Sequence, residues 1–155
     1  MGSRPVASRA VAALALAWVT VGCGGESASP SSGCVAGPAT IERALARAPS
    51  PVTLAGGSRL SQCVQRARSE GDLQSVGAVL TQAADRLARR APTTPRVALE
   101  LGYLIGAVER GGERTNGIDA ELVRRVEQDG GTLDRAPRAV ILAFRSGLAA
   151  GRASG

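Results

Sequence analysis

Two ionisable residue types are missing from this 155-residue chain, which contains no histidine and no lysine. Without histidine there can be no serine–histidine–aspartate or cysteine–histidine arrangement for nucleophilic catalysis, and no imidazole ligand for a metal. Without lysine there is no Schiff-base nucleophile and no lysine of a phosphate-binding loop. The composition therefore excludes most of the common catalytic mechanisms. We expect a protein that is not an enzyme and that uses no cofactor.

Aromatic side chains are also scarce and are limited to Trp18, Tyr103 and Phe144. The core must therefore be built from Leu, Val, Ile and many Ala, which suit closely packed helices. All 19 basic residues are arginines, and they outnumber the 13 acids to give a net charge of +6. A basic surface favours acidic partners such as anionic lipid headgroups or cell-wall polymers. The shortage of aromatic side chains for base stacking argues against a nucleic-acid partner.

The N-terminus has the pattern of a secretory signal peptide. Residues 1–10 carry Arg4 and Arg9 without any acid, and an apolar run of 11 residues then extends from Val11 to Val21. A bilayer-spanning helix requires about 20 apolar residues, so this run is too short to span a membrane. We expect residues 1–22 to direct export and then to be removed.

The end of this leader, Thr20-Val21-Gly22-Cys23, resembles the lipobox of bacterial lipoproteins, with Thr20 where leucine is usual. The resemblance implies cleavage before Cys23, attachment of a diacylglycerol to its sulfur, and an anchor on the outer face of the cytoplasmic membrane or elsewhere in the envelope. Two or three acyl chains such as palmitate anchor a protein stably, whereas one chain binds marginally. The alternative is an ordinary secretory signal, cut for example after Gly24, which would release a soluble protein.

A flexible tether is expected to follow the lipidated cysteine, so that residues 23–33 form the second segment of the chain. Residues 24–33 read GGESASPSSG, which is rich in Gly, Ser and Pro and has no hydrophobic periodicity. Ten residues of this composition span roughly 15–20 Å root-mean-square. The tether would therefore hold a domain close to a membrane surface.

Counting cysteines predicts one disulfide. Lipidation of Cys23 leaves Cys34 and Cys63, an even number in an oxidising compartment. A bond between them would fix the start of the domain to its second helix and would stabilise it by about 3–4 kcal/mol in the chain-entropy model. The alternative is two separate thiols, with Cys63 a small core residue.

Residues 34–155 are predicted to form a small all-α domain. Hydrophobic periodicity, Gly and Pro predict six helices, at about 38–48, 58–70, 72–91, 95–110, 117–129 and 134–150. Short connections favour antiparallel neighbours, and hence an antiparallel helical bundle or a helical-hairpin array of five to six helices. A repeat array resembling tetratricopeptide hairpins ranks lower, because no signature residues recur at a fixed period. The predicted N-caps are Ser58, Asp72, Thr94, Asn116 and Asp134, and the last five residues are expected to fray.

An arginine cluster at the end of the third predicted helix, Arg86, Arg89 and Arg90, has two interpretations. It could bind the anionic groups of phospholipids or of a wall polymer. It could equally be a solvated set of cations at a helix C-terminus, where the helix dipole favours positive charge. We favour the second interpretation and keep the first as a candidate anion-binding site.

Gly102 and Gly106 form a GxxxG motif in the fourth predicted helix. Such a motif lets two helix backbones approach closely. We expect close packing inside the soluble domain, with a homodimer contact as the alternative.

An acidic, glycine-containing segment, residues 109–121, invites comparison with a calcium-binding loop. If Gly117 is aligned with the sixth position of an EF-hand, Gly112 falls on the first ligand position and Arg114 on the third. Neither residue can supply the required carboxylate. The segment is better explained as a polar turn, and we predict no metal site there.

These patterns together predict a membrane-anchored envelope lipoprotein. We expect a non-enzymatic interaction or structural module that binds an envelope protein or an anionic polymer. One alternative is a small-ligand-binding or enzymatic helical domain whose site has no recognisable sequence motif. Another is binding of anionic lipid or wall polymer through the arginine-rich helix ends.

Overall fold

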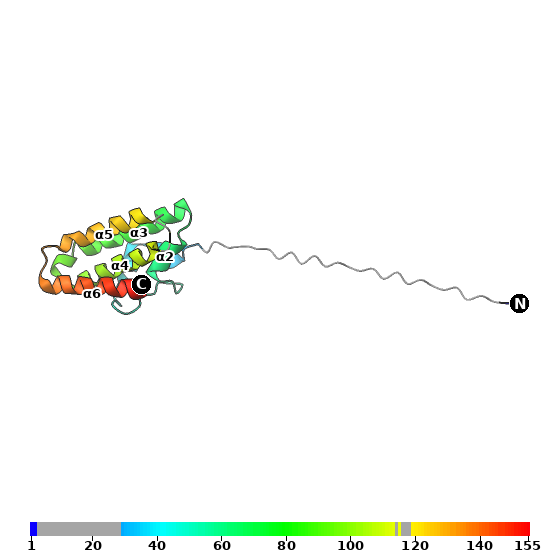
Figure 1. Ribbon diagram of the computed structural model, residues 1–155, viewed down its shortest axis with the longest axis horizontal. Helices are drawn as coiled ribbons and strands as arrows, with labels where there is room; N and C mark the ends of the chain where they lie inside the picture. The colour runs from blue at the N-terminus through cyan, green and yellow to red at the C-terminus, as the bar shows by residue number, and fades with distance from the viewer. Residues whose placement is uncertain (3–28, 114, 116–118) are drawn as a thin grey trace.

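The computed structural model describes residues 1–2, 29–113, 115 and 119–155, and within them the chain is a bundle of helices (Figure 1). In chain order, the helices of the described residues are α1 (Pro38–Leu45), α2 (Leu60–Arg66), α3 (Glu70–Ala88), α4 (Pro95–Gly112), α5 (Ala120–Gly130) and α6 (Arg138–Ser154). Short 3-10 helices occupy Ser32–Val35, Ala91–Thr93 and Gly131–Leu133. The described ranges contain one isolated β-bridge, Thr53–Arg59, and no longer strand pairing. The predicted all-α class is confirmed.

Helix α4 forms the centre of this bundle. Every residue from Leu101 to Val108 is buried, on all sides of the helix. The reason is that α2, α3, α5 and α6 all pack against α4, so no side of its middle faces water. A helix surrounded in this way must be apolar all round, and the sequence LGYLIGAV satisfies that condition.

The contact between α4 and α6 is made by glycines on both helices. On α6, a Cβ atom added to Gly147 would lie 2.9 Å from the amide nitrogen of Tyr103, and one added to Gly151 would lie 2.9 Å from that of Ala107. Each would also overlap a carbonyl oxygen of α4. The backbone of α6 therefore rests directly on the backbone of α4.

Two glycines of α4 likewise lie against the backbone of α6. A Cβ atom added to Gly102 would lie 2.9 Å from the amide nitrogen of Leu148, and one added to Gly106 would lie 2.9 Å from that of Arg152. The GxxxG motif thus packs closely inside the domain, as expected, and α6 of the same chain covers it. We name the four residues Gly102, Gly106, Gly147 and Gly151 the glycine seam.

The two helices of the glycine seam run parallel, because residue numbers rise together along the contact. Consecutive helices α4 and α5 are instead antiparallel, since Gly112 lies against Val123 and Gly130 lies against Ile105. The predicted alternation of direction therefore holds for these sequence neighbours. The closest pair in the bundle, however, is formed by α4 and α6, which are separated by α5 in the chain.

The predicted boundary between the second and third helices was wrong. Gly71 and Asp72 do not separate two helices but lie in the first turn of α3, which begins at Glu70. The Ser69 hydroxyl accepts a hydrogen bond from the Asp72 amide at 3.1 Å, and the Asp72 carboxylate accepts one from the Ser69 amide at 3.3 Å. This capping box satisfies two free amide groups, so the N-cap of the helix is Ser69 rather than Asp72. Ser58, also predicted as a cap, instead precedes the Arg59 N-cap of α2.

Other predicted helix ends shift by a few residues. Helix α4 begins at Pro95 after Thr94, as predicted, but continues through Gly111 to Gly112. A Cβ atom at Gly111 would lie 2.9 Å from the carbonyl oxygen of Ser61, so this glycine serves packing against α2 rather than ending the helix. Helix α6 begins after Pro137 and not at Asp134. The predicted Asn116 cap lies outside the described residues, and Asp119 is the N-cap of α5.

The predicted fraying of the last five residues was also wrong. Helix α6 continues through Ser154, and Gly155 is buried. The Ser61 hydroxyl donates a hydrogen bond to the Gly155 carbonyl oxygen at 2.5 Å. The buried Tyr103 hydroxyl lies 3.2 Å from the Ser154 hydroxyl and accepts a hydrogen bond from the Val52 amide at 2.9 Å. These bonds join the end of α6 to α2, α4 and the loop before α2.

Substitution of Gly147 by alanine tests the glycine seam. We expect Gly147→Ala to lower the free energy of unfolding by about 3 kcal/mol, because the new methyl group must push two backbones apart. Gly71→Ala is the matched control, since a Cβ atom at exposed Gly71 meets no atom within 4 Å. It should raise stability by about 0.5–1 kcal/mol through helix propensity. Chemical denaturation under one set of conditions measures both values, and equal stability of the two variants would contradict the close backbone contact.

Candidate functional site

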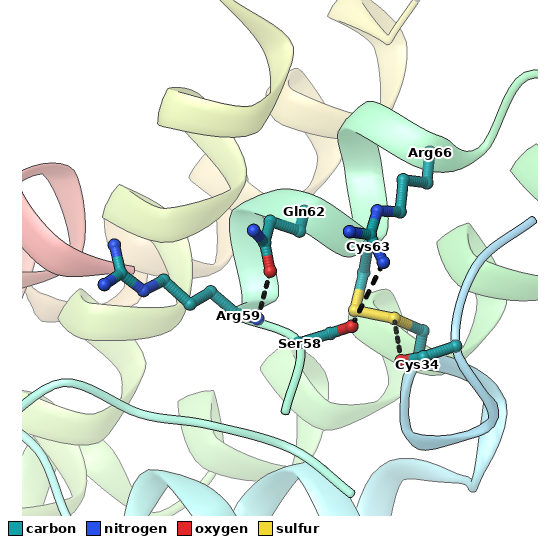
Figure 2. Close-up of a disulfide and its surroundings, with 7 residues drawn as sticks. Cys34, Ser58, Arg59, Gln62, Cys63 and Arg66 are labelled. Carbon is teal, nitrogen blue, oxygen red and sulfur yellow. Dashed lines mark hydrogen bonds between the residues drawn. A yellow bond between two sulfur atoms is a disulfide. The ribbon is translucent and has the colours of Figure 1, made fainter. Parts of the chain in front are cut away.

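The two cysteines predicted to pair lie together in the structure (Figure 2). The sulfurs of Cys34 and Cys63 are 2.06 Å apart, at disulfide distance, and both residues are buried. The bond joins the 3-10 helix Ser32–Val35 to α2. Close to it, the Arg66 guanidinium donates a hydrogen bond to the Ser58 hydroxyl at 3.5 Å. The first described residues of the domain are thereby fixed to α2, as the sequence predicted.

The predicted lipidation site, Cys23, lies outside the described residues, as do residues 3–22 of the leader and residues 24–28 of the predicted tether. Its modification stays a prediction from the sequence.

The predicted anion-binding arginines are partly occupied by contacts within the domain. Arg86 and Arg90 both pair with Glu42 of α1, with nitrogen–oxygen distances of 3.7 Å and 2.6 Å. Arg90 also donates a hydrogen bond to the Arg86 carbonyl oxygen at 3.1 Å, in the last turn of α3. Arg89 forms the C-cap of the same helix. These contacts support the interpretation as helix-end cations, and anion binding by the cluster stays a prediction.

A polar groove at one end of the bundle is the candidate site that the sequence did not reveal. Its volume is about 520 Å³, and α4, α5 and the end of α6 form its walls. The lining residues are Glu109, Gly112, Glu113, Ala120, Val123, Arg124, Glu127 and Arg152. These residues come from three separate stretches of the chain, so no local motif could predict their meeting. We name this feature the α4–α5–α6 groove.

A bidentate ion pair between Arg152 and Glu109 forms part of the lining of this groove. The Arg152 guanidinium contacts the Glu109 carboxylate through Nε–Oε2 at 2.5 Å and Nη2–Oε1 at 3.0 Å. The Glu109 side chain is 13% exposed, so the pair is shielded from water on the carboxylate side. The hydrogen bond that Arg152 donates to Glu109 raises the pKa of Arg152 above its ordinary value. The pair links the C-terminal part of α4 to the end of α6.

A second carboxyl group, Glu127, lies beside this ion pair. Its pKa is raised, first by burial, then by the negative charge of Glu109 and a hydrogen bond with it, while Arg152 acts in the opposite direction. The groove thus combines carboxyl groups with the guanidinium groups of Arg124 and Arg152. Chemically, this arrangement suits a small polar ligand or a peptide carrying both signs of charge.

A further acid pair lies between α3 and α5, where Asp85 faces Asp129. The pKa of Asp129 is raised to about 6, first by burial and then by the charge of Asp85 and a hydrogen bond with it, whereas Arg89 lowers it. One Asp129 carboxyl oxygen is buried without a hydrogen-bond partner among the described residues. Two carboxyls in contact favour one shared proton, which explains the direction of the shift.

The acidic segment at residues 109–121 does not gather its acids at one point. Glu109 and Glu113 line the groove, whereas Asp119 is buried at the start of α5. Burial raises the pKa of Asp119, opposed by a hydrogen bond with Thr115 and the charge of Arg68. Over the described part of the chain, no three cysteine, aspartate or glutamate side chains converge as a metal site would require.

Comparison with known proteins returns no relative: no family model, no curated protein and no solved structure matches this chain. In the part that the structure describes, no helix combines the length and the apolar character needed to cross a membrane.

The Asp85–Asp129 pair predicts a specific pH dependence of stability. Because the native pKa of Asp129 lies above its ordinary value of 3.8, the native state holds a proton that the unfolded state has lost between about pH 4 and pH 6. Stability should therefore fall as the pH rises through this window. Asp129→Asn should remove this decline and raise the free energy of unfolding at pH 7 by about 1 kcal/mol, after allowance for solvent screening at a half-buried site.

Denaturant titrations between pH 3 and pH 8 check this dependence. Asp134→Asn, an exposed aspartate on the loop before α6, is the matched control and should leave the pH profile unchanged. An Asp129→Asn profile that still declines through the same window would contradict the assignment.

Proposed function

We propose that this protein is a membrane-anchored lipoprotein of a bacterial envelope, and that its helical domain is a non-enzymatic interaction or structural module. The anchor would be an acylated Cys23, reached through the tether of residues 23–33. The domain would act by binding an envelope protein or an anionic polymer outside the cytoplasm.

The observation that carries this proposal is the distribution of the three cysteines. Cys34 and Cys63 lie at disulfide distance in the folded domain. Disulfides persist in oxidising compartments, which supports an extracytoplasmic location. Cys23 is then the one remaining cysteine, and it directly follows an apolar leader with a basic start. The pairing and the leader are independent features that agree on the same compartment.

The organisation of the domain supports an interaction module. Its interior is filled mainly by leucine, valine, alanine and the glycine seam, and most charged side chains lie at the surface. Binding of a small polar ligand in the α4–α5–α6 groove is the second candidate, because Glu109, Glu127 and Arg152 meet there.

Mass spectrometry of the intact mature protein tests the proposed anchor and the disulfide together. The protein is isolated from the membrane fraction and measured with and without reductant and alkylating agent. We expect a chain that starts at Cys23, carries added acyl mass, and gains two hydrogens on reduction. A Cys23→Ser variant should lack the acyl mass.

Two outcomes would overturn parts of the proposal. An unacylated chain that starts at another residue would exclude the lipid anchor and indicate a released protein. Two thiols that react with the alkylating agent before reduction would exclude the disulfide, and the extracytoplasmic location would lose that support.

A further inference from the structure

The last helix of the domain carries positive charge without any acidic residue. From Arg135 to Gly155 the sequence contains four arginines and no aspartate or glutamate. Within α6, arginines recur every seven residues and therefore share one side of the helix. We name the exposed row that they form with the residues between them the α6 stripe: Arg138, Leu142, Arg145, Ala149 and Arg152.

The α6 stripe faces away from the bundle. Successive residues of a helix are about 100° apart, so Gly147 and Gly151 project roughly opposite to the centre of the stripe. Because these two glycines rest on α4, the stripe must point outward. All five of its members are exposed, and α6 lies along one edge of the bundle, with α3 and α5 drawn on the far side of α4 (Figure 1).

Three arginines at this face carry uncompensated charge. Arg135, just before the helix, Arg138 and Arg145 form no ion pair with any described residue. Asp134 is adjacent to Arg135 in the chain and lowers the local charge at that end. The middle of the stripe is left without an acid on its own helix.

Some other arginines of the domain have acidic partners. Arg86 and Arg90 share Glu42, and Arg152, at the end of the stripe, is held by Glu109. Unpaired arginines also occur elsewhere among the described residues, for example Arg43, Arg59 and Arg68. What distinguishes α6 is that its arginines form one exposed row on a helix without an acid.

Leu142 adds an apolar group to the middle of this basic face. It is 53% exposed, and among the described residues Met1 and Val35 are the other large apolar residues that are exposed. An exposed leucine alone is ordinary on a protein surface. Here it lies one turn from Arg138 and from Arg145. A bilayer interface can bind both the cationic and the apolar side chains, because its phosphate groups overlie an apolar layer. A wall polymer offers the anions but no apolar layer.

We propose that the α6 stripe, together with Arg135, docks onto the anionic phospholipid headgroups of the membrane to which Cys23 is anchored. This inference rests on the proposed function, because the tether supplies the proximity. Residues 24–31, which precede the 3-10 helix at Ser32, span roughly 14–17 Å, so the stripe is held at a high effective concentration above the headgroups. The arginines contact phosphate oxygens, and Leu142 enters the interface between headgroups and acyl chains.

A tryptophan placed in the stripe reports docking directly. Trp18 is the single tryptophan of the chain and lies in the leader, so a full-length Trp18→Phe/Leu142→Trp variant carries one tryptophan in the domain. The mature form made by cells is reconstituted in phosphatidylcholine vesicles with and without phosphatidylglycerol. We expect blue-shifted emission and quenching by brominated acyl chains when phosphatidylglycerol is present. The matched control is Trp18→Phe/Ser75→Trp, with the probe at an exposed position of α3, and it should show neither effect.

Charge removal tests the role of the arginines. In the same Leu142→Trp background, Arg138→Gln/Arg145→Gln should lower the ratio of docked to undocked protein by about fivefold for each arginine removed. Arg43→Gln/Arg125→Gln removes two exposed charges from α1 and α5 and should change the ratio by about twofold or less. Equal losses in the two variants would overturn the stripe as a specific docking surface. Emission that is unchanged between the two vesicle types would overturn it as well.

The mass of each mature sample separates this inference from the proposed function. An acylated Cys23 with no docking signal refutes the docking surface and leaves the lipid anchor intact. A mature chain whose mass shows no acyl group refutes the anchor. If that chain still gives a docking signal when added to the vesicles, the docking surface is retained.

Discussion

The backbone contact between α4 and α6 is the constraint on which the rest of the structure depends. Glycines on both helices let the two backbones touch, and any larger side chain would hold them apart. With α6 seated so closely, the other sides of α4 are free to receive α2, α3 and α5. The core is therefore built around one central helix. The position of that helix against α6 depends on small residues more than on large ones. Close packing of this kind tolerates little change in volume.

The same contact determines which chemistry faces outward. Because Gly147 and Gly151 turn one side of α6 toward α4, the opposite side is fixed toward solvent, and Arg138, Leu142 and Arg145 occupy it. The end of the helix is held separately, by the Glu109–Arg152 ion pair and by the buried Gly155. A rigidly oriented row of charges is better suited to a flat anionic surface than one on a helix free to rotate.

The disulfide lies near the same end of the domain as the C-terminus of α6, because Ser61 of α2 bonds Gly155. Cys34 is among the first described residues after the proposed tether, and its bond to Cys63 would transfer any pull on that tether to α2. Helix α2 in turn packs on α4, where Gly111 lies against Val64. The proposed tether would thereby be connected, through two close contacts, to the helix that organises the core. This arrangement would hold the domain intact beside a membrane surface.

The sequence by itself determined the helical class, the pairing of Cys34 with Cys63 and the close packing of Gly102 and Gly106, because each depends on local periodicity, on cysteine number or on a short motif. It failed at Ser69–Asp72, where a reciprocal cap outweighed the glycine between them. Only the tertiary structure decided that α6 is the partner of α4, that Glu109 meets Arg152 and that α6 turns its arginines outward. These features join residues about forty positions apart, and only the packing of whole helices brings such residues together.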